Sequence, residues 1–184
     1  YMLHGVALIG VRSVLGIENE KGSLFNVQQS LHILNLTHDE VKEMFHWYET
    51  ESGQEIKPEV IEKIYRETGG QPGLTSWLGE ILTEGIENFP NDTSKPITLA
   101  DFENIYRLAI NILPNNNILN IISKAKIKSY RNTVINLFKT DKPVKFRFDD
   151  KEINYLYMNG VIEPETIGGD DSYVKFASPF VQKR

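Results

Sequence analysis

The stretch TGGQPGLTSWLGEIL, residues 68–82, decides how the middle of this chain folds. Two adjacent glycines are followed, one residue later, by a proline. Glycine readily adopts the left-handed conformation in which helices end, and proline at a first helical position loses no hydrogen bond. Apolar residues then recur at helical spacing at positions 74, 77, 78, 81 and 82. The stretch therefore predicts the end of one helix, a corner at residues 69–72 and the start of another helix.

Three further helix starts are predicted around this corner. Thr37 and Glu40 have the spacing of a capping box, in which each side chain bonds the other residue's backbone. Pro58 stands where a second helix would begin, and the hydroxyl of Thr98 is suited to capping a later one. The middle of the chain is therefore expected to be a small helical bundle.

The opening of the chain has a different pattern. Residues 4–16 include a nearly continuous apolar run, which is typical of a parallel strand covered on both faces. A second short strand is expected at residues 30–34. Since neither has a neighbouring strand in the sequence, we interpret residues 1–35 as the remnant of a parallel α/β sheet and expect the chain to be the C-terminal part of a larger protein.

The last third alternates helices and strands. A helix at 129–140, a strand at 143–148 and a helix capped by Asp149 and Asp150 precede two short strands, VIEPE and YVKFA. This is the order of a winged helix. Ser178 and Pro179 then begin a final helix. The predicted fold is mainly α with minor β.

Charge and composition divide the chain in two. Residues 1–92 carry 6 Lys+Arg and 15 Asp+Glu, whereas residues 93–184 carry 14 and 10, and the stretch 87–96 between them is rich in turn formers. No apolar run approaches the length of a membrane span, so no membrane contact is expected. The absence of cysteine excludes disulfides and thiolate metal sites and fits a cytoplasmic protein. The four histidines are scattered, so no metal site is predicted.

Three segments resemble parts of one protein class. ALIGVRS at 7–13 resembles a sensor-1 strand, ETGGQPGL at 67–74 resembles the GxP motif of a helical lid, and VKFASPFVQKR at 174–184 resembles the end of the domain, in AAA+-like, STAND-type regulatory ATPases. The resemblance covers nearly the whole chain. It implies strands of a nucleotide-binding core at 1–35, a helical lid at 36–92, and connecting helices with a winged-helix domain at 93–184.

The resemblance also implies a nucleotide site for ATP or ADP. The lid motif assigns Gly70, Gln71 and Pro72 to it, and the sensor-1 strand assigns Arg12 or Ser13. A glycine pair lets a backbone approach closely, and an arginine at a strand end suits a γ-phosphate. Taken locally, the corner is better described as a glycine cap before a first-turn proline, but the order of the surrounding elements favours the lid. An arginine that simply enters solvent at the end of its strand is an equal alternative for Arg12.

The sequence lacks the catalytic parts of such an ATPase. It contains no G-x-x-x-x-G-K-[ST] loop, no strand ending in paired acidic residues for Mg²⁺, and no arginine at the start of the lid helix. The chain alone is therefore expected to be inactive, with the phosphate loop and Mg²⁺ in upstream parts of the parent ATPase. Expected partners are nucleotide and the parent's other domains, and a homo-oligomer remains open.

A basic face offers an alternative function. Between residues 124 and 147 the chain has eight Lys and Arg but only one acidic residue, Asp141. A winged helix with such a face could bind nucleic acid, with Lys124, Lys126, Lys128 and Arg131 as the candidate contacts. The expected recognition helix and wing carry aspartates at 149, 150, 170 and 171, which would repel the phosphates of a nucleic acid. Nucleic-acid binding is therefore the second hypothesis, after the nucleotide-binding lid. A solvated lysine face is a third reading.

Overall fold

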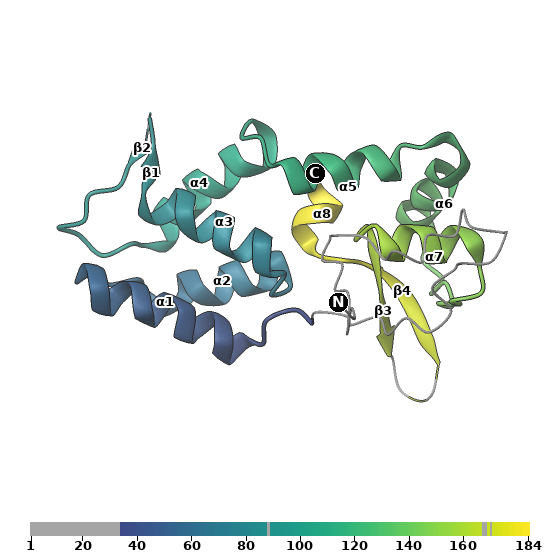
Figure 1. Cartoon of the computed structure of the whole chain (residues 1–184), viewed down its shortest axis with the longest axis horizontal. Helices are drawn as coiled ribbons and strands as arrows, with labels where there is room; N and C mark the ends of the chain where they lie inside the picture. The colour runs from purple at the N-terminus through teal and green to yellow at the C-terminus, as the bar shows by residue number, and fades with distance from the viewer. Residues whose placement is uncertain (1–33, 88, 167–168, 170) are drawn as a thin grey trace, which may run out of the picture. The chain divides into compact units, whose positions relative to one another are not determined.

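The computed structural model describes residues 34–87, 89–166, 169 and 171–184 (Figure 1). The described chain is mainly helical, with two small two-stranded sheets. The strands predicted at 4–16 and, except for Leu34, at 30–34 lie outside the described residues, as do Arg12 and Ser13.

The chain divides into two compact units. We call Leu34–Asn120 with Phe176–Arg184 the helical unit and residues 121–175 the mixed unit. The division falls between residues 120 and 121, not at the turn-rich stretch 87–96 that suggested a boundary at 92/93.

The helical unit consists of α1 (His38–Ser52), α2 (Pro58–Thr68), α3 (Pro72–Thr83), a hairpin of β1 (Gly85–Ile86) and β2 (Phe89–Pro90), α4 (Leu99–Asn111) and α8 (Pro179–Lys183). Helix α5 (Asn116–Ala125) spans the division between the units. Figure 1 shows α1, α2 and α3 following one another back and forth, and α2 contacts α1, α3, α4 and α8. Helix α2 is thus the centre of this unit.

The predicted helix starts are confirmed. The Thr37 backbone N–H donates to Glu40 Oε2 at 2.7 Å, and the Glu40 N–H donates to Thr37 Oγ1 at 3.3 Å, which completes the capping box. Pro58 and Pro72 begin α2 and α3. At α4 the Asp101 carboxylate accepts from both the backbone N–H and the hydroxyl of Thr98, at 2.9 and 2.6 Å.

The core of the helical unit follows the predicted apolar spacing. All of its helices contribute buried apolar side chains, among them Val41, Phe45, Val60, Ile64, Leu74, Leu78, Phe102, Ile105 and Phe180, joined by Ile56 and Ile97 from the connections. Burying such side chains is the main stabilising contribution to a fold of this kind.

Hydrogen bonds from Gln54, which is 2% exposed, hold the described part of the stretch 87–96 against the rest of the helical unit. Its side-chain amide donates to Asn91 Oδ1 at 2.9 Å and to the Lys95 carbonyl at 2.8 Å, and its carbonyl accepts from Tyr48 Oη at 2.6 Å. Next to it, Ile56 and Ile97 form a parallel bridge. The turn-forming residues therefore lie in a loop that is held against the unit. The buried Gln54 amide makes the hydrogen bonds to this loop that water would otherwise make.

The mixed unit contains α6 (Lys128–Lys139), α7 (Lys151–Met158), β3 (Ile162–Thr166) and β4 (Ser172–Phe176). The strand predicted at 143–148 is shorter than expected: Phe146 N donates to Ser172 O at 2.7 Å and Val174 N to Val144 O at 2.8 Å, around a single bridge. The mixed unit therefore has the predicted order of helix, short strand, helix and hairpin.

A small apolar core holds the mixed unit together. Ile153, Leu156, Val161 and Ile162 are buried at its centre, with half-buried apolar side chains from α5, α6 and β4 packed around them. Asp150 caps α7, accepting from the backbone N–H groups of Glu152 and Ile153 at 2.9 and 3.0 Å. Among the described residues, no helix is both long enough and apolar enough to span a membrane.

Candidate functional site

The corner between α2 and α3 has the predicted geometry. Gly69 and Gly70 adopt left-handed backbone conformations, with φ of 62° and 71°, and the Gly69 N–H closes the end of α2 by donating to Tyr65 O at 2.9 Å. Gln71 returns to extended backbone and Pro72 begins α3. Two consecutive left-handed residues are inexpensive only for glycine, which explains the Gly-Gly pair.

Two buried threonines fix this corner from the inside. The Thr68 hydroxyl donates to Ile64 O at 2.9 Å and accepts from the Thr75 hydroxyl at 3.0 Å and from the Gly70 N–H at 3.2 Å. Both side chains are fully buried. This pair was not predicted from the sequence, although threonines flank the motif symmetrically in TGGQPGLT.

Gly70 permits a close backbone approach, but the approaching backbone belongs to the chain itself. The Leu36 N–H donates to Gly70 O at 2.8 Å, and a Cβ added at position 70 would lie 2.0 Å from Leu36 O. Gly70 is buried. The segment that leads into α1 therefore makes the close backbone approach that the glycine pair allows.

Of the described residues predicted for the nucleotide site, Gln71 and Pro72 are the ones that reach the surface. Gln71 is exposed and Pro72 is half-buried. The side-chain carbonyl of Gln71 accepts from the Leu74 N–H and so caps α3, while its NH₂ group makes no hydrogen bond to any described residue. Together they place an amide donor and a rigid apolar ring side by side at the N-terminus of α3.

A buried carboxylate lies directly before the corner. Glu67 is 3% exposed, and its Oε2 accepts from Tyr106 Oη at 2.5 Å and from Lys183 Nζ at 2.6 Å. Burial by itself would raise the pKa of Glu67, but these hydrogen bonds and the charges of Lys183 and Lys63 together bring it below its ordinary value. Burial and the bond to Glu67 raise the pKa of Tyr106.

The C-terminal segment packs against the same corner. Ser178, which is 4% exposed, caps α8 by accepting from Val181 N at 3.2 Å. A Cβ added at Gly69 would lie 3.3 Å from Ala177 O. The Arg184 guanidinium donates to the carbonyls of Ala109, at 2.9 Å, and Ile110 at the end of α4. Residues 177–184 therefore tie α2 and α4 together beside the corner.

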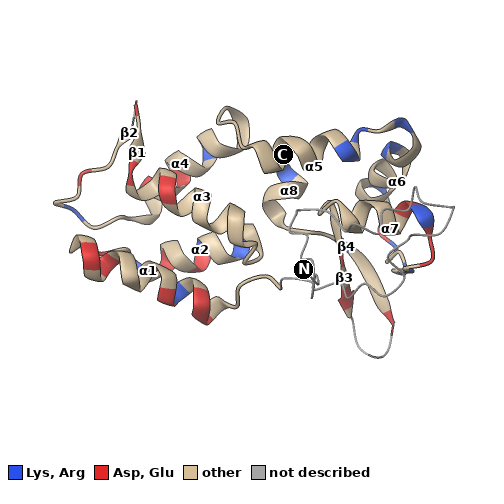
Figure 2. Ribbon diagram, in the orientation of Figure 1, with Lys and Arg blue, Asp and Glu red and all other residues tan. Residues whose placement is uncertain are grey.

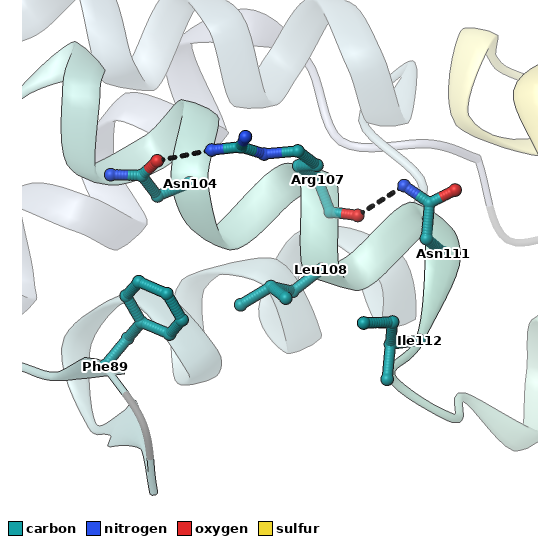
Figure 3. A pocket seen from close by; sticks show the side chains of 6 residues that line it. All are labelled: Phe89, Asn104, Arg107, Leu108, Asn111 and Ile112. Carbon is teal, nitrogen blue, oxygen red and sulfur yellow. Dashed lines mark hydrogen bonds between the residues drawn. The ribbon is translucent and has the colours of Figure 1, made fainter.

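A shallow pocket on α4 is a weaker candidate. Phe89, Leu108 and Ile112 form its apolar lining (Figure 3). Its polar groups bond one another: Arg107 Nη2 donates to Asn104 Oδ1 at 2.6 Å, and Asn111 Nδ2 donates to Arg107 O at 2.8 Å. Because these groups serve their own helix, the pocket offers few convergent polar atoms to a ligand.

The predicted basic face separates into two groups of residues. Lys145 pairs with Asp171 at 2.9 Å, and Arg147 pairs with Asp149 at 3.0 Å. In contrast, Lys126, Lys128 and Arg131 are exposed, line one surface hollow and form no ion pair with any described residue. Figure 2 shows this basic concentration around the turn from α5 to α6.

No group of three or more His, Cys, Asp or Glu in the described part of the chain is arranged to hold a metal ion. Comparisons with protein-family models, with curated proteins and with solved structures find no match to this chain. Interpretation of the corner therefore depends on its residues and geometry.

Proposed function

We propose that this chain is the helical lid and winged-helix portion of an ATP-binding, AAA-like regulatory ATPase of the STAND type, and that the corner at residues 68–72 closes over the nucleotide. The observation that carries this proposal is the rigid corner, which presents Gln71 and Pro72 at the surface while Thr68 and Thr75 hold it from beneath. A pre-organised site binds better because less conformational freedom is lost on binding.

Each surface residue has a role suited to a nucleotide. The ring of Pro72 offers an apolar face to an adenine base without leaving an unsatisfied N–H. The unbonded NH₂ of Gln71 can donate to a base or ribose oxygen. In this proposal Arg12 or Ser13 contacts the phosphates, whereas the phosphate loop and Mg²⁺ belong to other parts of the parent protein, which carry out any hydrolysis.

The same corner is suited to transmitting the nucleotide state. Gly69 packs on Ala177, and residue 177 directly follows β4 of the mixed unit. Glu67 joins the corner to α4 and α8 through Tyr106 and Lys183. We therefore propose that a shift of the corner on nucleotide binding reaches partner domains through α8 and the chain that connects it to β4.

Binding of a fluorescent ADP to the parent protein, extended upstream through its nucleotide core, tests this function. Pro72→Ala removes about two methylene groups from the proposed base contact and should weaken binding roughly tenfold. Pro58→Ala is the matched control, because Pro58 also begins a helix of the same unit and is exposed. It should leave ADP affinity unchanged.

Two results would contradict the proposal. One is an extended protein that binds neither ADP nor ATP. The other is an equal loss of affinity in the Pro72 and Pro58 variants, which would mean that the proline acts only through helix stability.

A further inference from the structure

Helix α1 carries an exposed tryptophan between carboxylates. Positions 39, 43, 47 and 51 are four residues apart, so their side chains follow one stripe along the helix. They are Asp39, Glu43, Trp47 and Glu51, and all four are exposed, Trp47 to 63%. None of these carboxylates forms an ion pair with a described residue, and the Trp47 ring contacts no other described aromatic ring. We call these four residues the α1 stripe.

Fold stability does not explain the α1 stripe. Asp39 and Glu43 lie one turn apart and repel each other. Glu51 lies in the last turn of α1, which contains no basic residue, although the helix dipole favours cations there. Trp47 contributes little to the core, because most of its surface is exposed to water. A positively charged partner with an apolar surface would stabilise all of these side chains.

The mixed unit has a surface of this kind at the start of α6. One hollow is lined by Lys126, Lys128, Arg131, Asn132 and Ile135, and we call it the α6 hollow. Its three cations are exposed and form no ion pair with any described residue. The first turn of α6 contains no acidic residue, so Lys128 and Arg131 lie unfavourably at the positive end of the helix dipole. Ile127, which is 37% exposed, and the half-buried Ile135 add apolar surface.

We propose that the α1 stripe of one copy of this chain docks into the α6 hollow of a second copy. Trp47 projects from α1 and enters the hollow, where its ring meets Ile135 and the guanidinium of Arg131. A guanidinium over an indole face is a favourable cation–π contact, and tryptophan and arginine are the residues that most often dominate binding energy in interfaces. The carboxylates of the α1 stripe lie on either side of Trp47 and pair with Lys126 and Lys128.

Charge complementarity favours a second copy over other anionic partners of the α6 hollow. A nucleic acid or an anionic membrane would pair with the cations, and Ile127 would also suit a lipid surface. Either partner would repel the carboxylates of the α1 stripe and leave Trp47 without a contact. A second copy gives both surfaces the opposite charge at once. Because two different surfaces meet, the contact does not close on itself, and copies add head to tail.

Sedimentation velocity of the 184-residue chain, over a concentration series reaching the millimolar range, tests this contact. The wild type should associate as its concentration rises, and salt should weaken the association. E43Q/E51Q and K126Q/K128Q/R131Q should each remain monomeric. Their one-to-one mixture should form dimers and nothing larger, because each variant keeps one intact surface. No nucleotide is needed, so the result is independent of the proposed function.

Two control variants remove the same number of charges from other exposed sites. E80Q/E84Q changes carboxylates at the end of α3, and K139Q/K142Q/K151Q changes cations of the mixed unit outside the α6 hollow. None of these five residues forms an ion pair with a described residue. Both controls should associate like wild type. Matching thermal unfolding of all variants excludes misfolding as the cause.

A single substitution tests the aromatic contact. Trp47→Ala should weaken association roughly 10- to 30-fold while leaving its salt dependence in place. The proposal is overturned if the wild type remains a monomer at every concentration, if the one-to-one mixture does not associate, or if Trp47→Ala has no effect. It is also overturned if the control variants lose association equally, or if dT20 or phosphatidylserine vesicles bind the α6 hollow of a chain that stays monomeric.

Discussion

Gly53 and Gly70 have almost the same left-handed backbone, with φ of 73° and 71°, but in different surroundings. Gly53 ends α1 with no atom within 4 Å of the position a Cβ would take. At Gly70 that position is 2.0 Å from Leu36 O. Gly53 is therefore required by conformation alone, whereas Gly70 is required by both conformation and space.

Alanine substitution should separate these two requirements. Gly53→Ala should lower the free energy of unfolding by about 1–2 kcal/mol, the energy of a left-handed L-residue. Gly70→Ala should lower it by that amount plus roughly another 1–3 kcal/mol for the overlap with Leu36. Urea unfolding followed by tryptophan fluorescence measures both. Equal effects would mean that the Leu36 segment moves aside easily.

Among the described residues of the helical unit, Glu67 is the one charged residue that is buried. Its side chain is 4% exposed, and it holds Tyr106 and Lys183 from two other helices. An isolated buried carboxylate would be strongly unfavourable, and these partners offset that penalty. The net result is the lowered pKa of Glu67.

Stability should therefore depend on pH through Glu67. Because the pKa of Glu67 is lower in the folded state than its ordinary value of 4.5, its contribution is present above pH 4.5 and is lost as pH falls below it. Glu67→Gln should lower the free energy of unfolding by about 2 kcal/mol at pH 7, and by less in acid. Urea unfolding between pH 7 and pH 3.5 tests this. Glu80→Gln, an exposed change on α3, should have little effect at any pH in that range.

At the scale of elements, α8 is short but firmly attached. Phe180 is fully buried, with its ring 6.0 Å from Trp77 and 5.7 Å from Tyr106, centre to centre, in edge-on contacts. Five residues cannot hold a helix by themselves in water. Helix α8 therefore exists because the helical unit provides a socket for Phe180 and acceptors for Lys183 and Arg184.

Phe180→Ala should lower the free energy of unfolding of the helical unit by about 3–5 kcal/mol, because it leaves a cavity among aromatic rings. Phe89→Ala removes the same ring from a position that is 45% exposed. It should have an effect of less than about 1 kcal/mol. Thermal unfolding compares the two variants. Similar shifts in Tm would show that the Phe180 socket contributes little.

At the scale of the whole molecule, the chain leaves the helical unit through α5 and returns to it at residue 176. Charge follows the same division. The helical unit has 8 Lys+Arg and 15 Asp+Glu, whereas residues 121–175 have 10 and 8. The corner at residues 68–72 and the exposed cations Lys126, Lys128 and Arg131 therefore belong to different units with different formal charge.

A chain ending at residue 176 should reveal this discontinuous arrangement. Both tryptophans, Trp47 and Trp77, belong to the helical unit, so their fluorescence reports on that unit. Without α8, the free energy of unfolding should fall by at least about 3 kcal/mol, which is seen as a lower urea midpoint. An unchanged midpoint would mean that the helical unit is complete without its C-terminal segment.

Local sequence determined where the helices begin and end. The Thr37–Glu40 box, the prolines at 58 and 72 and the glycine at 69 act on backbone groups within a few residues of themselves, so each could be recognised without knowing the fold. Helix α5 was not assigned, although Asn115 accepts from Ile118 N at 3.1 Å near its start. The asparagines at its start are equally typical of a loop. Burial of Ile118 favours the helix over the loop.

Tertiary structure alone decided which distant residues meet. Glu67 and Lys183 are 116 positions apart, Gln54 and Lys95 are 41 apart, and Gly70 and Leu36 bring α2 and the α1 entry into backbone contact. No local pattern encodes such pairs, because their energy comes from burial that exists only once the helices have packed. The sequence by itself therefore determined the corner and the helices beside it, while packing decided that the chain's own backbone lies against Gly70.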